Sequence, residues 1–176
     1  MIYLVGGPPR VGKSTLALIA LEDAGIPHCS TDMLVGMLET AAPSLGVRHG
    51  FHADKATSMS VLLTEFVRCA DLGNEAYLVE GDVVMPAFAT AVRSRLSAMR
   101  CVFLGNTKLT DDALRRMPDW LAGQDAAGYD DARRRIIRLS ESLRDDCTQE
   151  GHPYIEMGDG WETGLAAAAR ALGVAT

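Results

Sequence analysis

The chain has 176 residues, of which 48% are hydrophobic and 23% are charged, a composition typical of a globular domain. This balance excludes a disordered or collagen-like protein. The formal net charge of −6 argues against nucleic-acid or acidic-membrane partners, because binding them needs a basic face. Only three of the 17 basic residues are lysines, Lys13, Lys55 and Lys108, so the placement of these few cations matters.

The four cysteines lie far apart and form no Cys-x-x-Cys or Cys/His cluster, so neither a zinc site nor a redox pair is predicted. The apolar residues 1–5 are too few for a signal peptide, and no window approaches the length of a membrane span. We therefore expect a reduced, cytoplasmic protein. The oligomeric state stays open.

Short apolar runs alternate with helical patterns along the chain, which is typical of an α/β fold with a parallel sheet. We expect five strands, over residues 2–5, 27–29, 76–80, 101–104 and 153–157. Helices are expected over residues 14–24, 31–38, 57–72, 86–99, 110–121, 130–147 and 162–172. Two apolar helix stripes are predicted: Leu62, Phe66 and Cys69, and Ala132, Ile136, Leu139 and Leu143. Since no repeat or linker occurs, residues 1–176 are predicted to form a single domain.

A glycine-rich loop follows the first predicted strand and precedes the first helix. Its sequence is G-x-x-x-x-G-K-S, and we expect all of it to bind a nucleotide: Gly7, Pro8, Pro9, Arg10, Val11, Gly12, Lys13, Ser14 and then Thr15. Gly7 and Gly12 let successive backbone N–H groups point at a phosphate, and the following helix N-terminus adds to this field. Lys13 can reach the β and γ phosphates, and the Ser14 hydroxyl can bind Mg²⁺. This pattern predicts binding of a nucleoside triphosphate.

No N-K-x-D guanine motif of a GTPase is present. The positions of the acidic residues outside the loop instead favour a kinase that phosphorylates a small molecule. Asp32 follows the second strand, so a parallel sheet brings it to the edge where the phosphate loop opens. There it can orient or deprotonate an attacking hydroxyl group. The alternative is a helix N-cap. The two roles can be divided, with Thr31 as the cap and Asp32 facing the substrate.

Glu80 and Asp82 come at the end of the most apolar predicted strand. A carboxylate at such an edge can bind Mg²⁺ through water or help to place the nucleophile, and we assign this role to Glu80. The pair Gly81-Asp82 is equally typical of a solvated turn.

Basic residues gather in two further segments. Arg134 and Arg138, with Arg135 beside them, are candidates for catalytic lid residues that neutralise charge on transferring phosphate. Their acidic neighbours make a solvated helix face with ion pairs an equally good interpretation. The irregular residues 41–56 carry a basic cluster, Arg48, His49, His52 and Lys55, where substrate recognition is expected, within a region of about residues 32–56. A polar loop explains this cluster equally well.

Three segments together resemble the nucleoside and small-molecule kinase branch of phosphate-loop proteins. They are Gly7 to Thr15, Ser30-Thr31-Asp32, and Tyr77-Leu78-Val79-Glu80-Gly81. The last two are similar to motifs of the zeta-toxin and 2-phosphoglycerate-kinase-like group and of the chloramphenicol-phosphotransferase-like kinases. The resemblance implies a three-layer α/β/α fold with strand order 2-3-1-4-5 and ATP with Mg²⁺. It also implies a helical lid near residues 115–138 and adenine packing near Gly158 to Gly160.

One position departs from a related pattern. The run Thr31-Asp32-Met33-Leu34 is similar to a segment of adenylate kinases in which an arginine that grips the acceptor phosphate comes next, and here that position is Val35. This departure disfavours a nucleoside monophosphate as acceptor, unless Arg48 or Arg93 substitutes.

The leading hypothesis is an ATP-dependent phosphotransferase that acts on a hydroxyl group of a small metabolite, sugar acid or antibiotic. Lys13, Ser14 and the loop would hold ATP and Mg²⁺, with Glu80 supporting the metal. The competing hypotheses are a nucleotide-dependent regulatory module that transfers nothing, and a nucleoside or nucleotide kinase.

Overall fold

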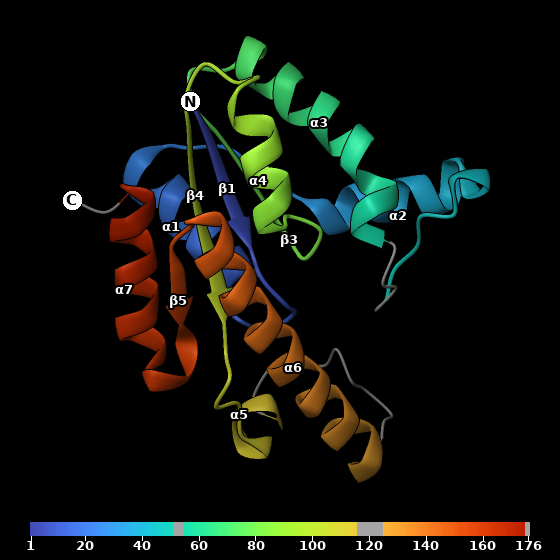
Figure 1. Ribbon diagram of the computed structural model, residues 1–176, viewed down its shortest axis with the longest axis vertical. Helices are drawn as coiled ribbons and strands as arrows, with labels where there is room; N and C mark the ends of the chain where they lie inside the picture. The colour runs from blue at the N-terminus through green and yellow to red at the C-terminus, as the bar shows by residue number, and fades with distance from the viewer. Residues whose placement is uncertain (51–54, 116–124, 175–176) are drawn as a thin grey trace.

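The computed structural model describes residues 1–50, 55–115 and 125–174 (Figure 1). Its central sheet has five strands: β1 (Ile2–Gly6), β2 (His28–Ser30), β3 (Tyr77–Gly81), β4 (Met99–Gly105) and β5 (Tyr154–Glu156). All neighbouring pairs are parallel, and the spatial order is β2-β3-β1-β4-β5. The α/β class, the parallel sheet and the predicted strand order are therefore confirmed.

Helices cover both faces of this sheet and make the three layers. They are α1 (Lys13–Ala24), α2 (Thr31–Ala41), α3 (Lys55–Gly73), α4 (Pro86–Arg93), α5 (Asp111–Arg115), α6 (Ala126–Glu150) and α7 (Trp161–Leu172), with short 3₁₀ turns η1 (Pro43–Leu45) and η2 (Met157–Asp159). Buried residues of α1 and α7 share one hydrophobic cluster, and those of α3 and α4 share the other. Parallel strands buried in this way need apolar side chains on both faces.

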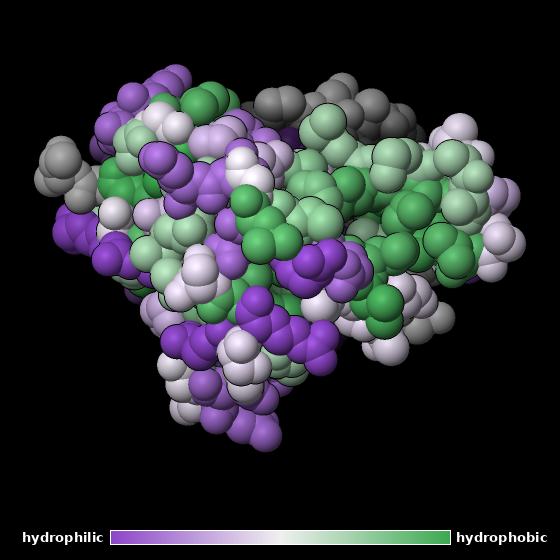
Figure 2. Space-filling view, turned by 90° about the horizontal axis from the view of Figure 1, so that it is seen from above, coloured by the Kyte–Doolittle hydropathy of each residue, from purple (hydrophilic) through white to green (hydrophobic). Residues whose placement is uncertain are grey.

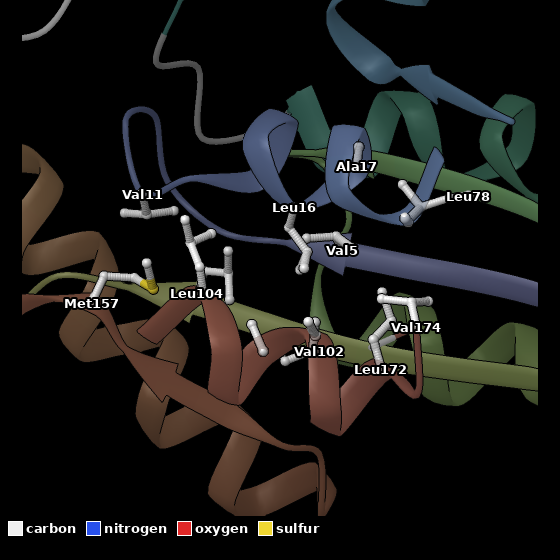
Figure 3. Packing of buried hydrophobic residues seen from close by; sticks show 14 of the residues in the cluster. Val5, Val11, Leu16, Ala17, Leu78, Val102, Leu104, Met157, Leu172 and Val174 are labelled. Atoms are coloured by element: carbon white, nitrogen blue, oxygen red, sulfur yellow. The ribbon is translucent and has the colours of Figure 1, made fainter. Parts of the chain in front are cut away.

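The central strand β1 shows how one strand serves both clusters. Ile2 and Leu4 belong to the cluster with α3 and α4, whereas Val5 belongs to the cluster with α1 and α7. Successive side chains of a strand point to opposite faces, so the continuous apolar run of β1 anchors both layers. Figure 3 shows the cluster with α1 and α7, in which Leu16 of α1 lies over Val5.

One predicted apolar stripe is wrong in its register, and the other is wrong at one position. In α3 the buried positions are one residue further along, at Met59, Leu63 and Val67, while Leu62 and Cys69 are exposed. In α6 Ala132, Ile136 and Leu143 are buried as predicted, but Leu139 is 41% exposed and Ser140 takes the buried place. In α3, apolar side chains such as Val61, Leu62 and Leu72 also occur on the exposed side, so periodicity alone could not select the face that the sheet covers.

The end of one predicted helix and the N-cap of another also change. The helix from Pro86 ends at Arg93 rather than at residue 99, because β4 begins at Met99 and pairs with β1. At the start of α2, Ser30 is the N-cap, and its side chain accepts a hydrogen bond from the backbone N–H of Asp32. Thr31 is therefore not the cap. It is a fully buried residue in the first turn.

The carboxyl ends of the strands define the edge at which the phosphate loop lies. Figure 1 shows α6 extending past this lower edge of the sheet, so that its first turns lie beside α5. The predicted lid, residues 115–138, thus corresponds to the end of α5 and the first half of α6, and its residues 116–124 fall outside the described part of the chain. A helix that overhangs this edge can bring side chains toward a ligand there.

Hydrophobic side chains also reach the surface. Figure 2 shows them gathered on the right, over the end of the molecule where α2 and α3 lie. Exposed large hydrophobic residues of these two helices are Met33, Met37, Val61, Leu62 and Leu72. Within the described ranges, no helix is long and apolar enough to cross a membrane.

A buried histidine joins α4 to the far edge of the sheet. The His152 ring contacts the Thr90 hydroxyl through Nε2 at 2.9 Å and the Cys101 sulfur through Nδ1 at 3.3 Å. Burial lowers the pKa of His152, and the positive charge of Arg93 lowers it further, although Pro86 and Glu150 act in the opposite direction. The neutral ring is therefore the form that the fold favours.

This histidine predicts a loss of stability in mild acid. Because the folded pKa lies below the unfolded value of about 6.5, the unfolded chain binds the proton first. The contribution of His152 is complete above that value and is lost as the pH falls through the folded pKa. Urea unfolding at pH 7 and pH 5 should therefore show a smaller loss of unfolding free energy for His152→Gln than for the parent chain. Equal losses would contradict this role.

Candidate functional site

The phosphate loop between β1 and α1 has the backbone geometry that anion binding requires. Gly7 and Gly12 have φ angles of 148° and 97°, which side-chain-bearing residues rarely adopt. Gly12 is the N-cap of α1, and no side chain of the described residues caps this helix end. The first N–H groups of α1 are thus available to an anion, and the helix dipole favours negative charge at the same place.

Lys13 is the positive charge of this loop. Its Nζ atom donates a hydrogen bond to the Pro8 carbonyl oxygen at 2.9 Å. Burial lowers the pKa of Lys13, while the nearby carboxylates of Glu80, Asp82 and Asp32 raise it. The ammonium group is therefore poorly solvated, which strengthens its attraction for a phosphate, while the nearby carboxylates keep it protonated.

Ser14 and Glu80 connect the loop to the neighbouring strand. The Ser14 hydroxyl donates a hydrogen bond to Glu80 Oε1 at 2.9 Å, and Glu80 is only 3% exposed. Glu80 is placed by β3, whose residues 80 and 81 pair with Val5 and Gly6 of β1 just before the loop begins. A hydroxyl and a carboxylate held together at this edge are ligands of the kind that Mg²⁺ takes in addition to phosphate oxygens and water.

A cavity of about 360 Å³, called here the phosphate-side cavity, brings the predicted residues together. Its lining includes the two loop residues and three carboxylates from different segments, Lys13, Ser14, Asp32, Glu80 and Asp82. Arg10 and His49 also line it. Asp32, which sequence reasoning placed at this edge, thus faces the same space as the phosphate loop. Its backbone N–H donates a hydrogen bond to the Ser30 hydroxyl oxygen at 3.3 Å.

An ion pair that the sequence does not reveal crosses this region. The Lys55 ammonium group at the start of α3 lies 2.7 Å from Asp82 Oδ2, and the Lys55 side chain is only 8% exposed. The other carboxylate oxygen, Asp82 Oδ1, is buried and has no hydrogen-bond partner among the described residues. Asp82 is therefore part of the site and not a solvated turn residue.

The arginines of α6 divide into two sets. Arg134 pairs with Asp130 at 2.9 Å, and Arg133 contacts Asp130 and Asp111, so these two form the helical ion pairs of the alternative interpretation. Arg135 and Arg138 instead line a second cavity beside the phosphate loop. Arg138 forms no ion pair with the described residues. The structure thus brings Arg138 to the site but directs Arg134 to an acidic neighbour on its own helix.

The second cavity has a volume of about 460 Å³ and is called here the apolar cavity. Its uncharged lining is mostly hydrocarbon: Pro8, Pro9, Ala56, Val83, Met85, Leu139 and Leu143. It shares Pro9, Gly50, Lys55 and Asp82 with the phosphate-side cavity. The two cavities therefore adjoin at the Lys55–Asp82 ion pair.

Other predicted residues have mixed outcomes. His49 reaches the phosphate-side cavity and packs over Gly36, where a Cβ atom would come within 3.1 Å of its Nε2 atom. His52 falls outside the described residues. Near the expected adenine region, η2 is followed by Trp161, whose ring lies 3.1 Å from the place that a Cβ atom on Gly12 would take. Trp161 has no motif around it in the sequence, so its place beside the phosphate loop was not predicted.

Comparison with known proteins agrees with this arrangement. A gluconokinase from Sinorhizobium meliloti is similar with a TM-score of 0.62 and 16% identity, covering 97% of this chain and 90% of the other. A shikimate kinase from Bacteroides thetaiotaomicron is similar with a TM-score of 0.59 and 19% identity, covering 98% and 97%. The sheet order, the phosphate loop and these similarities define a phosphate-loop kinase-like fold.

Similarity in sequence is more restricted. No family model matches the chain. A cytidylate kinase from Granulibacter bethesdensis is 36% identical over 72 residues, which are 41% of this chain. That match spans about a third, 34%, of the length of the cytidylate kinase.

The buried ion pair predicts strong energetic coupling between α3 and the end of β3. Lys55→Met should leave Asp82 as an unpaired, largely buried charge, and Asp82→Asn should do the same to Lys55. We expect a double-mutant cycle in urea to give a coupling free energy of about 1–3 kcal/mol. The exposed pair Arg68 and Glu65 in α3 is the matched control and should show much weaker coupling. Equal coupling of the two pairs would contradict the prediction.

Proposed function

We propose that the protein is an ATP-dependent phosphotransferase that moves the γ-phosphate of ATP to a hydroxyl group of a small molecule. The observation that supports this best is the phosphate-side cavity, in which the phosphate loop, Glu80 and Asp32 face one another. A module that only binds nucleotide has no need of a carboxylate placed to receive an acceptor proton. The proposal also agrees with the kinase names of the structures that share this fold.

The residues of the loop fit a triphosphate with Mg²⁺. The N-terminus of α1 and the Lys13 ammonium group supply positive charge, and the Ser14 hydroxyl and Glu80 supply oxygen ligands. Among the described residues no group of three His, Cys, Asp or Glu side chains could hold a metal without the nucleotide. This suits Mg²⁺, which is usually bound through one or two protein oxygens plus phosphates and water. When bound, the metal would neutralise charge on the β and γ phosphates.

Asp32 would orient the acceptor hydroxyl and take up its proton. In the transfer, a bond forms between the acceptor oxygen and the γ-phosphorus, and the bond from that phosphorus to the β,γ-bridging oxygen breaks. The bridging electron pair leaves with ADP, and the acceptor proton goes to the Asp32 carboxylate. Lys13 would stabilise the charge that develops on the leaving phosphate, so catalysis rests on positioning and charge neutralisation.

Arg138 is the best candidate among the α6 arginines for a contact with the transferring phosphoryl group. It lines the apolar cavity together with Gly7 and Pro8 of the phosphate loop, and it has no acidic partner among the described residues. Arg134 is the weaker candidate, because Asp130 already neutralises it. The overhang of α6 would allow Arg138 to approach the phosphates if the helix closes over the loop.

Two sequence motifs support an alcohol as the class of acceptor. The segments Ser30-Thr31-Asp32 and Val79-Glu80-Gly81 support the zeta-toxin, 2-phosphoglycerate-kinase-like and chloramphenicol-phosphotransferase-like branch, whose acceptors carry alcohol groups. A nucleotide kinase is the second candidate, because 36% identity to part of a cytidylate kinase favours it. Against it stands Val35, a fully buried core residue at the position where an acceptor-binding arginine would be needed.

Replacing Asp32 by Asn tests the assignment of the proton acceptor. The substitution keeps the size of the side chain but removes its basicity, so acceptor-stimulated ADP release should fall by about 10²–10⁴-fold. Binding of ATP, measured by calorimetry, should be retained. Asp23→Asn, an exposed position of α1, is the matched control and should leave both unchanged.

The acceptor screen for this test should contain sugars, phosphorylated acids, nucleosides, CMP and amphiphilic alcohols. Unchanged turnover in Asp32→Asn would remove Asp32 from the mechanism. Stimulation by CMP alone would favour the nucleotide kinase. If ATP binds but no acceptor accelerates ADP release, the nucleotide-dependent regulatory module is the better account.

Glu80→Gln tests the metal role separately from the hydroxyl contact. Glutamine can still accept the Ser14 hydrogen bond, but it lacks the negative charge that attracts Mg²⁺. We expect the Mg²⁺ concentration for half-maximal ADP release to rise about tenfold, while ATP binding without Mg²⁺ stays close to that of the parent chain. Glu22→Gln, exposed on α1, serves as the control. An unchanged Mg²⁺ dependence would contradict a metal role for Glu80.

A further inference from the structure

We propose that the acceptor is an alcohol with an apolar, hydrocarbon-rich body that occupies the apolar cavity. Its hydroxyl end would lie at the Lys55–Asp82 ion pair, next to the phosphate-side cavity. This inference rests on the proposed phosphotransferase function and deepens it by naming the chemical class of the substrate. The arrangement of the two cavities carries the argument.

The first step is the junction between the cavities. Four residues, Pro9, Gly50, Lys55 and Asp82, line both of them. Lys13, Ser14, Asp32 and Glu80 line only the phosphate-side cavity, whereas the aliphatic wall and the two arginines Arg135 and Arg138 line only the other. A molecule that fills the apolar cavity can therefore present one end to the groups assigned to ATP. Transfer between two ligands requires such an adjoining pair of spaces.

The second step is the chemistry of the wall. Val83, Met85, Leu139 and Leu143 come from two separate segments and meet around about 460 Å³, a volume in the range of small-molecule sites. Leu139 is 41% exposed, although the helix periodicity predicts it to be in the core. A hydrocarbon body bound there would cover this side chain. A polyol would instead lose water from hydroxyl groups that these side chains cannot replace.

The third step is the polar end. Asp82 Oδ2 is held by Lys55 at 2.7 Å, and Asp82 Oδ1 is buried without a hydrogen-bond partner among the described residues. A buried acceptor atom of this kind is costly unless a donor reaches it. An O–H or N–H group near the reacting hydroxyl of the substrate would satisfy it. Asp82 thus acts as a positioning and specificity residue, and Asp32 remains the proton acceptor on the phosphate side.

The test compares two acceptors that differ in the polarity of their bodies, 3-phenylpropan-1-ol and D-gluconate. ADP release is measured with saturating ATP and Mg²⁺ over a range of each acceptor. Saturation-transfer NMR without ATP reports binding of each acceptor independently of turnover. We expect 3-phenylpropan-1-ol to give the higher kcat/KM and the stronger saturation transfer.

Two matched variants locate the binding. Leu139→Gln makes the cavity wall polar at a half-exposed position, so the fold should be retained. It should raise the KM for 3-phenylpropan-1-ol about five- to tenfold and leave the KM for ATP unchanged. Leu72→Gln places the same change on an exposed leucine of α3 that lines neither cavity, and it should behave like the parent chain.

The results separate this inference from the proposed function. If D-gluconate is the better acceptor, or if both leucine variants behave alike, the apolar acceptor is overturned while the kinase stands. If no acceptor of the wide screen stimulates ADP release, the proposed function fails. The NMR measurement then still tests ligand binding without turnover. Loss of the saturation-transfer signal of 3-phenylpropan-1-ol in Leu139→Gln, but not in Leu72→Gln, would support an apolar ligand in this cavity. Persistence of the signal in Leu139→Gln would overturn the apolar ligand as well.

Discussion

The hydrogen bond from the Ser14 hydroxyl to Glu80 joins the two segments on which the rest of the site depends. It links the first turn of α1 to the end of β3 across the carboxyl edge of the sheet. Because β3 pairs with β1 in register up to Gly6 and Gly81, the last residues of the two strands, Glu80 lies beside the start of the phosphate loop. The two hydrophobic clusters on either side of β1 keep this edge in place. The site is therefore positioned by the core and not by its own contacts alone.

Charge placement explains how an acidic chain can hold a polyanionic ligand. The net charge is −6, yet Lys13 and Lys55 both lie at the edge where the strands end, where Lys13 is half-buried and Lys55 is buried. Buried cations attract anions more strongly than exposed ones, because solvent screens them less. Arg138 adds a third positive group that no described acidic residue neutralises. The acidic surface then argues against nucleic acid as a partner but not against a nucleotide.

The sequence predicted the parts of the fold that depend on local pattern and on known motifs. The strands, their order and the phosphate loop follow from short apolar runs, glycine spacing and the family resemblance. Asp32 and Glu80 were placed at this edge because Asp32 follows a strand, Glu80 lies at the end of one, and parallel strands end at one edge. The register of α3 and the exposure of Leu139 were missed, because they depend on which helix face the sheet covers.

Contacts between distant segments account for the other differences. Lys55 and Asp82 are 27 residues apart, and only the packing of α3 beside the end of β3 makes them a pair. The basic cluster that contains Lys55 gave a hint of function but no partner. Arg134 and Arg138 lie on the same helix with similar neighbours in sequence, yet Arg134 pairs with Asp130 whereas Arg138 lines the apolar cavity. Ser30 replaced Thr31 as the cap because Thr31 is buried against Gly81.

The proposed function depends first on a nucleoside triphosphate site formed by the phosphate loop and the half-buried Lys13 charge. Calorimetric titration of the full chain with ATP and Mg²⁺, beside the variant Lys13→Met, tests it most directly. We expect the parent chain to bind one ATP per chain in a saturable way. The affinity for ATP should fall at least tenfold in Lys13→Met, because methionine keeps the bulk of the side chain but not its charge. Absence of binding to the parent chain, or equal affinity of the two proteins, would contradict it.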